Sequence, residues 1–334
     1  MRVAIVRLTS LGDVVHTLPV AHAIRQHSPQ AYIVWIVEER EQHLLVDNPV
    51  VDEVVVGPTR RWRRELRTAG GLVRVLKEWG ALRDRLRTLA LDVALDVQGL
   101  LKSSIFTILT RAPVRIGFRW SHAREPLSSL FTTRRVTPPP HAVHKVDKNL
   151  SLLAPLGIPV GEVAFPIPLV PEAEARADAL LRAHEVTAQH RVVALLPATR
   201  RSAKQWPPES YRRLAERLVK TPGVRVLALG GPGEHATLES VAGGLDGDSI
   251  LRVTASTPDF VALLRRAQLA IGNDTGPVHL AAALGVPTLG LYGPTRAEEN
   301  GPYGPRSRFI QSSTHRIEDI PVDTVFRAVS DWLP

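Results

Sequence analysis

The chain has 334 residues, of which 44% are hydrophobic, and it contains no cysteine. This length favours two domains over a single core, and the absence of cysteine excludes disulfides, thiolate metal ligands and cysteine nucleophiles. Residues 1–165 carry 23 Lys and Arg against 15 Asp and Glu, whereas residues 166–334 carry 19 against 18. The basic first half therefore predicts an acidic partner: nucleic acid, an anionic lipid surface or a polyanionic small substrate.

The amino terminus does not have the pattern of a targeting segment. Its apolar run is short and is interrupted by Arg7 and Asp13, whereas a signal peptide needs a longer apolar core. No later stretch reaches the roughly 20 apolar residues of a membrane-spanning helix. We therefore expect a soluble protein that is at most bound to a membrane surface.

Apolar runs that alternate with helical patterns predict an α/β fold. In the first half, strands are expected at 3–8, 32–37, 54–56 and 91–97, and helices after the first strand, over 70–88 and after 98–104. A proline-rich stretch over 157–171 predicts a linker, and we place the domain boundary between residues 165 and 166. In the second half, strands are expected at 192–197, 224–229, 268–272 and 288–291, and helices at 172–184, 209–220, 234–243, 258–267 and 322–332, with a short apolar segment near 250–253. Val-rich and Ile-rich strands of this kind are typical of parallel sheets, with clefts at the carboxyl ends of the strands.

A turn formed by Asp274, Thr275 and Gly276 stands between a predicted strand and a helix whose first turns hold His279. Free N–H groups and the positive end of the helix dipole can bind phosphate at such a place. Asp274 alone is as well explained by helix capping. Together with the Tyr292-Gly293-Pro294-Thr295 loop, however, the turn favours a nucleotide diphosphate site.

Three further residues follow predicted strands. Asp13 stands at a helix start, where an ionised carboxylate can accept a proton as a weak base, although it can also be a simple cap. Lys204, in a loop that also holds Thr199, can neutralise a diphosphate leaving group, and the alternative is a solvated loop lysine. Glu234 follows a glycine-rich turn without G-x-G-x-x-G spacing, and we expect it to bind a ribose hydroxyl.

A basic cluster supplies the charge of the first half. Arginine pairs bidentately with phosphate and carboxylate, so such a cluster can hold a polyanion. Nucleic acid is the rival ligand, but neither an RNA-binding motif nor a helix-turn-helix is present. The cluster consists of Arg60, Arg61, Arg63, Arg64, Lys102, Arg119, Arg124, Arg134 and Arg135. The acidic pair of Asp246-Gly247-Asp248 lies in a glycine-rich turn, and we expect it at the surface rather than on a metal.

As a set, five motifs resemble the lipopolysaccharide heptosyltransferases, glycosyltransferase family 9, and among them the members that add the first heptose. The motifs are Thr9-Ser10-Leu11-Gly12-Asp13-Val14-Val15-His16-Thr17-Leu18-Pro19, Arg61-Trp62-Arg63, Asp96-Val97-Gln98-Gly99-Leu100-Leu101-Lys102-Ser103, Ala123-Arg124-Glu125-Pro126-Leu127 and Asn273-Asp274-Thr275-Gly276-Pro277-Val278-His279-Leu280. The resemblance implies a GT-B fold, in which two Rossmann-like α/β/α domains face each other across a cleft. The acceptor would lie on residues 1–165 and the nucleotide sugar on residues 166–334, and the C-terminal helix can pack back on the first domain.

The resemblance also implies an inverting, metal-independent transfer of L-glycero-D-manno-heptose from ADP-heptose to the Kdo of Kdo2-lipid A, without a cofactor. Asp13 takes the role of the base and Lys204 that of the diphosphate ligand. Donor binding falls to Thr199, Lys204, Glu234, Asp274, Thr275, Gly276 and His279, and acceptor binding to Arg60, Arg61, Arg63, Lys102 and Arg124. No metal ligand is implied.

The partners implied are ADP-heptose, Kdo2-lipid A and the anionic inner-membrane surface, and not nucleic acid. The protein would be cytoplasmic and peripheral on the cytoplasmic face of the inner membrane. One alternative is a family member of type II or III, which acts on an already heptosylated core. The other is a non-catalytic module that binds a nucleotide or nucleic acid.

Overall fold

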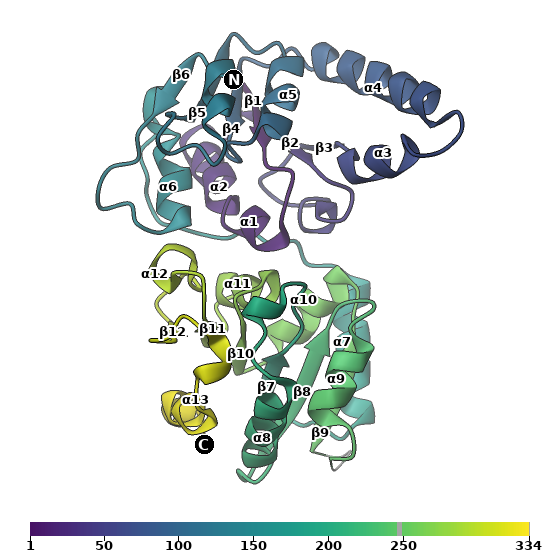
Figure 1. Ribbon diagram of the computed structural model, residues 1–334, viewed down its shortest axis with the longest axis vertical. Coiled ribbons are helices and arrows are strands. Elements are labelled where there is room, and N and C mark those ends of the chain that lie inside the picture. The colour runs from purple at the N-terminus through teal and green to yellow at the C-terminus, as the bar shows by residue number, and fades with distance from the viewer. Residues whose placement is uncertain (246–248, 334) are drawn as a thin grey trace. The chain divides into compact units, whose positions relative to one another are not determined.

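The computed structural model describes residues 1–245 and 249–333, so the Asp246–Asp248 turn lies outside the described residues (Figure 1). The chain divides into two compact units, Met1–Pro168 and Leu169–Pro334. This division falls three residues after the expected boundary between residues 165 and 166 and lies in the same proline-rich stretch.

Unit 1 is a six-stranded parallel sheet in the order β3-β2-β1-β4-β5-β6. Its strands are β1 (Arg2–Val6), β2 (Tyr32–Val37), β3 (Glu53–Val56), β4 (Val93–Asp96), β5 (Val114–Phe118) and β6 (Arg134–Val136). Its helices are α1 (Leu11–Val15), α2 (Leu18–His27), α3 (Thr59–Glu65), α4 (Gly71–Thr88), α5 (Leu101–Leu109) and α6 (Lys145–Ser151), with 3-10 turns η1 (Gln42–Leu44), η2 (Pro126–Phe131) and η3 (Ala154–Leu156).

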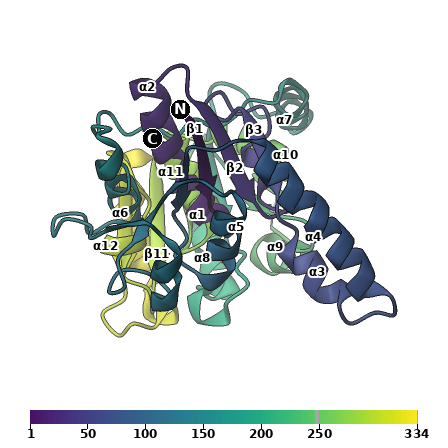
Figure 2. The same ribbon diagram turned by 90° about the horizontal axis from the view of Figure 1, so that it is seen from above.

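Helices cover both faces of the unit 1 sheet, and Figure 2 shows α2 and α4 on opposite sides of β1 and β2. Trp62 of α3, Val75 of α4 and Phe106 of α5 form one core cluster with the buried strands. Crossovers between parallel strands are right-handed, so α2, which joins β1 to β2, covers the opposite face. The helix α6 contacts α2 there.

Unit 2 repeats this architecture with the strand order β12-β11-β10-β7-β8-β9, again all parallel. Its strands are β7 (Arg191–Leu196), β8 (Val224–Gly230), β9 (Ile250–Thr254), β10 (Leu269–Asn273), β11 (Thr288–Tyr292) and β12 (Ser307–Gln311). Its helices are α7 (Pro171–Ala183), α8 (Pro208–Leu218), α9 (His235–Ala242), α10 (Thr257–Arg265), α11 (Gly276–Ala283), α12 (Ala297–Asn300) and α13 (Val322–Val329), with 3-10 turns η4 (Ser202–Lys204), η5 (Ile317–Asp319) and η6 (Ser330–Trp332).

The C-terminal helix α13 belongs to the core of unit 2. Its residues Val325 and Val329 are fully buried and share a cluster with Tyr211 and Leu214 of α8 and with Leu238 of α9. On the other face of the sheet, α10 contacts both α7 and α11. Each unit is thus a three-layered α/β/α structure, which confirms the predicted fold class.

Both sheets place their first and fourth strands side by side, β1 beside β4 and β7 beside β10. Sheets of this Rossmann-like order bind ligands outside the carboxyl ends of the strands, at the point where the strand order reverses. The loop of Asp13 follows β1 and that of Gln98 follows β4. In unit 2, the loop of Lys204 follows β7 and the turn of Asp274 follows β10. The fold therefore brings the predicted loops to the two switch points.

The sequence pattern does not predict β5, β6 and β12. Arginine occurs in each of these strands, as at Arg115, Arg134 and Arg308, so none of them is a continuous apolar run. Both β6 and β12 are edge strands, and several of their side chains are exposed. Charged side chains are common on edge strands because they keep the exposed edge from pairing with another chain, and here they interrupt the apolar pattern.

Candidate active site

Asp13 lies in the first turn of α1 with its side chain only 13% exposed. Its Oδ1 atom is 2.7 Å from Arg7 Nη2 and 3.5 Å from Lys145 Nζ. Its Oδ2 atom accepts hydrogen bonds from the backbone N–H and the hydroxyl of Ser10, at 3.2 and 3.1 Å. Burial alone raises the pKa of Asp13, but the charges of Arg7 and Lys145 and the Ser10 N–H outweigh burial and hold this pKa well below its ordinary value. Asp13 is therefore ionised and able to accept a proton, as a weak base.

Two side chains, Arg7 and Gln98, fix the segment that joins β1 to α1, the helix of Asp13. Arg7 is itself buried and donates from Nη1 to the carbonyl of Val97 at 2.8 Å. Gln98 accepts from the Leu8 N–H at 2.7 Å and donates to the Thr9 hydroxyl at 3.3 Å. The loops after β1 and β4 are thus joined directly, which holds the carboxylate at the switch point of unit 1.

The buried Asp96 shapes the loop after β4. It accepts from the N–H groups of Gln98 at 3.1 Å and Gly99 at 2.9 Å, and burial raises its pKa. Gly99 has φ = +64°, and a Cβ there would lie 3.3 Å from the Arg124 nitrogen. The Glu125 N–H donates to the Gly99 carbonyl at 2.8 Å, so the loop of the predicted acceptor residue Arg124 packs against this turn.

Lys102 of α5 lies beside the carboxyl end of β2. Its Nζ atom is 3.3 Å from both Glu38 Oε1 and Thr59 Oγ1, and Thr59 also donates to the buried Glu38. Glu38 accordingly joins α5 to the start of α3. Lys102 is only partly exposed. Like Asp13, its ammonium group lies at the carboxyl ends of the strands of the unit 1 sheet.

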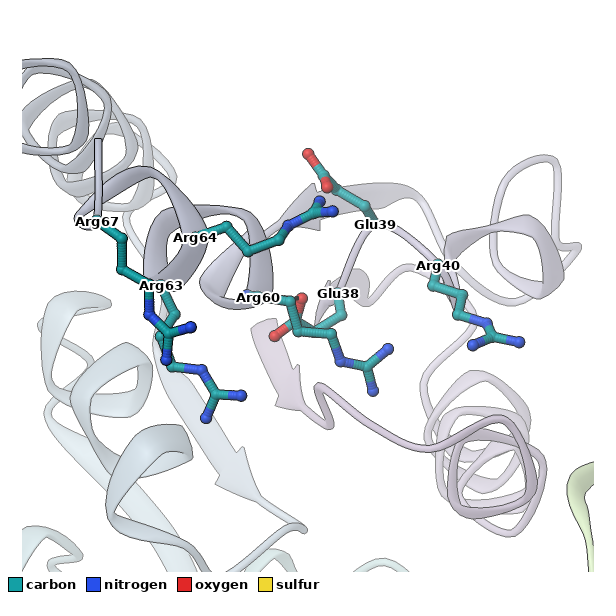
Figure 3. A pocket seen from close by; sticks show the side chains of 7 residues that line it. All are labelled: Glu38, Glu39, Arg40, Arg60, Arg63, Arg64 and Arg67. Atoms are coloured by element: carbon teal, nitrogen blue, oxygen red, sulfur yellow. Dashed lines mark hydrogen bonds between the residues drawn. The ribbon is translucent and has the colours of Figure 1, made fainter. Parts of the chain in front are cut away.

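Arg60 and Arg63 line one pocket, of about 530 Å³, together with Glu38, Glu39, Arg40, Arg64 and Arg67. Figure 3 shows Arg63 and Arg67 on one side of this pocket and Arg40 on the other. Arg60 Nη2 is 3.4 Å from Glu41 Oε1. Five guanidinium groups and two carboxylates line this pocket, and arginine matches the geometry of phosphate and carboxylate, so the pocket can accept an anion.

Arg61 does not line that pocket and instead lines a second one, together with Trp62 and Glu78. It forms a bidentate pair with Glu78 of α4, at 2.8 and 2.9 Å, and a third contact with Glu39 at 2.9 Å. Trp62 Nε1 donates to the same Glu78 at 2.8 Å. The hydrogen bond with Glu78 raises the pKa of Arg61, and the bonds from Arg61 and Trp62 lower the pKa of Glu78. The structure therefore separates Arg61 from Arg60 and Arg63.

Asp274 is the centre of the predicted donor site in unit 2, and its side chain is 4% exposed. Its Oδ2 atom pairs with the ammonium of Lys204. Its Oδ1 atom accepts from Asn300 Nδ2 at 2.6 Å and is 3.5 Å from His279 Nε2. Burial alone raises the pKa of Asp274, but His279 and Lys204 outweigh it and hold this pKa well below the ordinary value. Because both carboxylate oxygens have partners, Asp274 orients Lys204 and His279 at the start of α11.

Asn273 fixes the loop that carries Lys204. It is fully buried and donates to the Pro197 carbonyl at 2.8 Å. Its side-chain oxygen accepts from the Trp206 N–H at 3.1 Å and from the Tyr211 hydroxyl at 3.0 Å. The segment from Pro197 to Trp206 is thereby held at both ends against β10, and Lys204 extends from it toward Asp274.

The remaining predicted donor residues also lie at the carboxyl ends of strands. Thr275 caps α11 in an extended conformation, and Gly276 is the first residue of that helix. Thr199 follows β7, and its hydroxyl accepts from the Arg201 N–H at 3.3 Å. Glu234 stands before α9, where one carboxylate oxygen accepts from the Gly231 N–H at 2.7 Å. That bond closes the glycine-rich turn after β8.

Arg7, Lys145, Gln98, Asn273 and Asn300 complete the two sites, and no role was predicted for them from sequence. Arg7 offers a local signal, because a charged residue next to a buried strand needs a buried partner. Lys145 and Asn300 reach their carboxylates from distant parts of the chain. No spacing rule connects such pairs.

No group of three or more His, Asp or Glu side chains within residues 1–245 and 249–333 is arranged to hold a metal ion. The cations near the two carboxylates are side chains of the protein: Arg7 and Lys145 beside Asp13, and Lys204 beside Asp274. Arrangements of this kind can stabilise anionic oxygens electrostatically.

Comparison with known proteins places the chain in a family. The model of glycosyltransferase family 9 (heptosyltransferase) matches residues 79–323. Lipopolysaccharide heptosyltransferase 1 of Pseudomonas aeruginosa is 32% identical over 342 residues, which cover 100% of this chain and 88% of that protein.

Solved structures agree over the full chain. The heptosyltransferase WaaC of Escherichia coli with ADP superposes with a TM-score of 0.82 and 28% identity, covering 99% of this chain and 100% of that one. The same enzyme with ADP-2-deoxy-2-fluoro heptose gives a TM-score of 0.79 and 28% identity, with 99% of both chains covered. These likenesses confirm a two-domain α/β fold of the GT-B type. The chain belongs to glycosyltransferase family 9, the heptosyltransferases, and is a glycosyltransferase.

Proposed function

We propose that the protein transfers L-glycero-D-manno-heptose from ADP-heptose to the Kdo of Kdo2-lipid A, in the synthesis of the lipopolysaccharide inner core. The observation that carries this proposal is the likeness, over 99% of both chains, to a heptosyltransferase solved with ADP-2-deoxy-2-fluoro heptose. Its similarity to lipopolysaccharide heptosyltransferase 1 supports the choice of the first heptose.

The donor would bind at the switch point of unit 2. Its diphosphate would lie at the amino terminus of α11, against Thr275 and Gly276, where the helix dipole favours an anion. Lys204 would give up part of its interaction with Asp274 to neutralise the phosphates. His279, which lies in α11, would contribute to donor binding as well. Glu234 would bind the ribose, and Thr199 would contact the phosphates from the loop after β7.

The reaction would be a single displacement with inversion. A hydroxyl oxygen of Kdo attacks the anomeric carbon of heptose, the bond from that carbon to the diphosphate oxygen breaks, and the proton passes to the Asp13 carboxylate. ADP leaves with the electron pair of the broken bond, and Lys204 balances the charge that develops on it. Because the attacking hydroxyl becomes acidic as its new bond forms, a base as weak as Asp13 suffices late in the step.

The acceptor would lie on unit 1. Arg60 and Arg63 line the anion pocket, and Lys102 and Arg124 would contact the phosphates and carboxylates of the acceptor from neighbouring loops. Arg61, whose guanidinium is bonded to Glu39 and Glu78, would serve the acceptor by holding α3 in place.

The proposed reaction needs neither a cofactor nor a metal ion, since Lys204 supplies the positive charge at the leaving group. The acceptor is a lipid, so the enzyme would work as a cytoplasmic protein at the anionic surface of the inner membrane. Nucleic acid has no place in this proposal.

An ADP-release assay with two acceptors tests the proposal. Kdo2-lipid A should support release of ADP from ADP-heptose, and an already heptosylated acceptor should not. Release with the heptosylated acceptor alone would assign the protein to the members that add a later heptose. Binding of ADP-heptose without turnover on either acceptor would instead indicate a non-catalytic nucleotide-binding module.

A further inference from the structure

Unit 1 carries an apolar surface that the proposed chemistry does not use. In the described part of the chain, eleven of the seventeen exposed large hydrophobic side chains fall between residues 66 and 131. Six of these belong to α5 and η2, which pack against each other. We call this set the α5–η2 face: Leu101, Ile105, Ile108, Leu127, Leu130 and Phe131.

The α5–η2 face has the geometry of an amphipathic helix with a flanking turn. Leu101, Ile105 and Ile108 follow the spacing of one helix side and are 39%, 45% and 43% exposed. The opposite side of α5 buries Phe106 in the core of the sheet. Leu127 and Leu130 of η2 are 50% and 60% exposed. Soluble proteins rarely leave so many large apolar groups together in water unless the patch contacts something.

Basic side chains bonded to η2 indicate what the face contacts. Residues 101–135 contain seven Lys and Arg and a single acidic residue, Glu125. Arg115 and Arg135 donate from Nε to the backbone carbonyls of Phe131 and Ser129, at 3.0 and 2.8 Å. Arg134 donates to the Pro155 carbonyl at 2.8 Å. Bonds to carbonyl groups position these side chains but leave their positive charge in place.

A second copy of the chain would fit this face poorly, because two such faces would bring like charges together. An anionic bilayer offers the complementary arrangement, with negative headgroups outside and acyl chains within. No helix of residues 1–245 and 249–333 has both the length and the apolar character to cross a membrane.

We propose that the α5–η2 face docks on an anionic lipid bilayer. Its apolar side chains enter the boundary between headgroups and acyl chains, while the surrounding arginines bind lipid phosphates. Long basic side chains reach outward to headgroups in this way while their stems cover apolar surface.

The location of the face connects it to the proposed function, on which this part of the inference rests. Leu101 directly precedes Lys102, and its N–H donates to Glu125 Oε2 at 2.7 Å, beside Arg124. Docking through the α5–η2 face therefore brings Lys102 and Arg124 to the membrane surface, where the head group of a lipid acceptor lies. A lipid substrate would reach unit 1 without leaving the bilayer.

Co-sedimentation with vesicles that contain no acceptor tests the docking. The vesicles consist of phosphatidylglycerol and phosphatidylcholine in equal parts, with pure phosphatidylcholine as comparison. The double variant Ile105→Gln/Leu130→Gln should reduce binding to the anionic vesicles by about tenfold, since two half-exposed apolar side chains no longer enter the lipid. The matched control Val160→Gln/Leu169→Gln changes two side chains that are 52% and 53% exposed elsewhere, and it should bind as wild type does.

Undiminished vesicle binding by the α5–η2 variant, with an unchanged thermal midpoint, would overturn the proposal. So would a shift from dimer to monomer caused by the variant in the absence of lipid, since the face would then be covered by a second copy. High salt should weaken wild-type binding to anionic vesicles. Because the assay contains neither donor nor acceptor, its result does not depend on heptosyl transfer. Conversely, a protein that fails to dock should still turn over a soluble, lipid-free Kdo acceptor.

Discussion

Replacing Asp13 by Asn tests the base assignment most sharply. The amide keeps the size of the carboxylate and an oxygen that can still accept from Arg7, but it cannot take a proton. A general base contributes about 10²–10⁴-fold to a rate. Arg7, Lys145 and Ser10 hold the pKa of Asp13 well below its ordinary value against the opposing effect of burial, which makes it a weak base and favours the lower part of this range. We expect kcat to fall about 10²–10³-fold, which corresponds to roughly 3–4 kcal/mol of barrier.

Controls separate lost chemistry from lost structure. The proposed donor residues all lie in unit 2, so calorimetric binding of ADP to Asp13→Asn should match that of wild type. Asp52→Asn is the matched variant, because Asp52 pairs with Arg25 at 2.6 Å in the same unit and stands directly before β3, at the opposite strand edge. It should keep full turnover. If Asp13→Asn retained at least half of the wild-type rate while binding ADP normally, the base would have to be another group.

Three further outcomes follow from the two carboxylate clusters. Arg7→Met removes the positive charge that lowers the pKa of Asp13 most, so this pKa should rise. Because the ionised carboxylate is the active form, the acidic limb of the kcat/KM profile should move to higher pH. An unchanged profile would contradict the pairing of Arg7 with Asp13. Lys204→Met removes a charge-assisted contact of about 1.5–3 kcal/mol, so ADP should bind roughly ten- to a hundredfold more weakly by calorimetry; equal affinity would exclude Lys204 from the diphosphate site. Turnover should persist in excess EDTA, and a loss restored by Mg²⁺ would refute a metal-independent reaction.

The buried framework was predictable because its strands are continuous apolar runs. Residues 32–37 and 192–197, for example, are expected as strands and form β2 and most of β7. Parallel strands buried on both faces give the strongest signal that a single sequence offers. The strand β5 has no such apolar pattern, because Arg115 and Gly117 interrupt its five residues.

The sequence predicts which loops carry the candidate sites, but it does not predict which side chains contact one another there. Asp13 and Asp274 follow strands whose carboxyl ends are where ligands bind in such folds, so their positions could be expected. Their partners could not, because Lys145 and Asn300 approach through tertiary packing rather than through any local pattern. The contact of Arg61 could not be predicted either. Its side chain is bonded to Glu78 of a neighbouring helix, and sequence spacing does not place that helix beside Arg61.

The anomeric configuration of the product tests the central claim most directly. NMR of Kdo2-lipid A after incubation with the enzyme and ADP-heptose should show one added heptose, joined with the configuration opposite to that of the donor, and one ADP released for each bond formed. This result is what a single displacement requires, with Asp13 at the attacking hydroxyl and Lys204 at the leaving group. Retention of configuration, or release of free heptose without a new bond to Kdo, would contradict it.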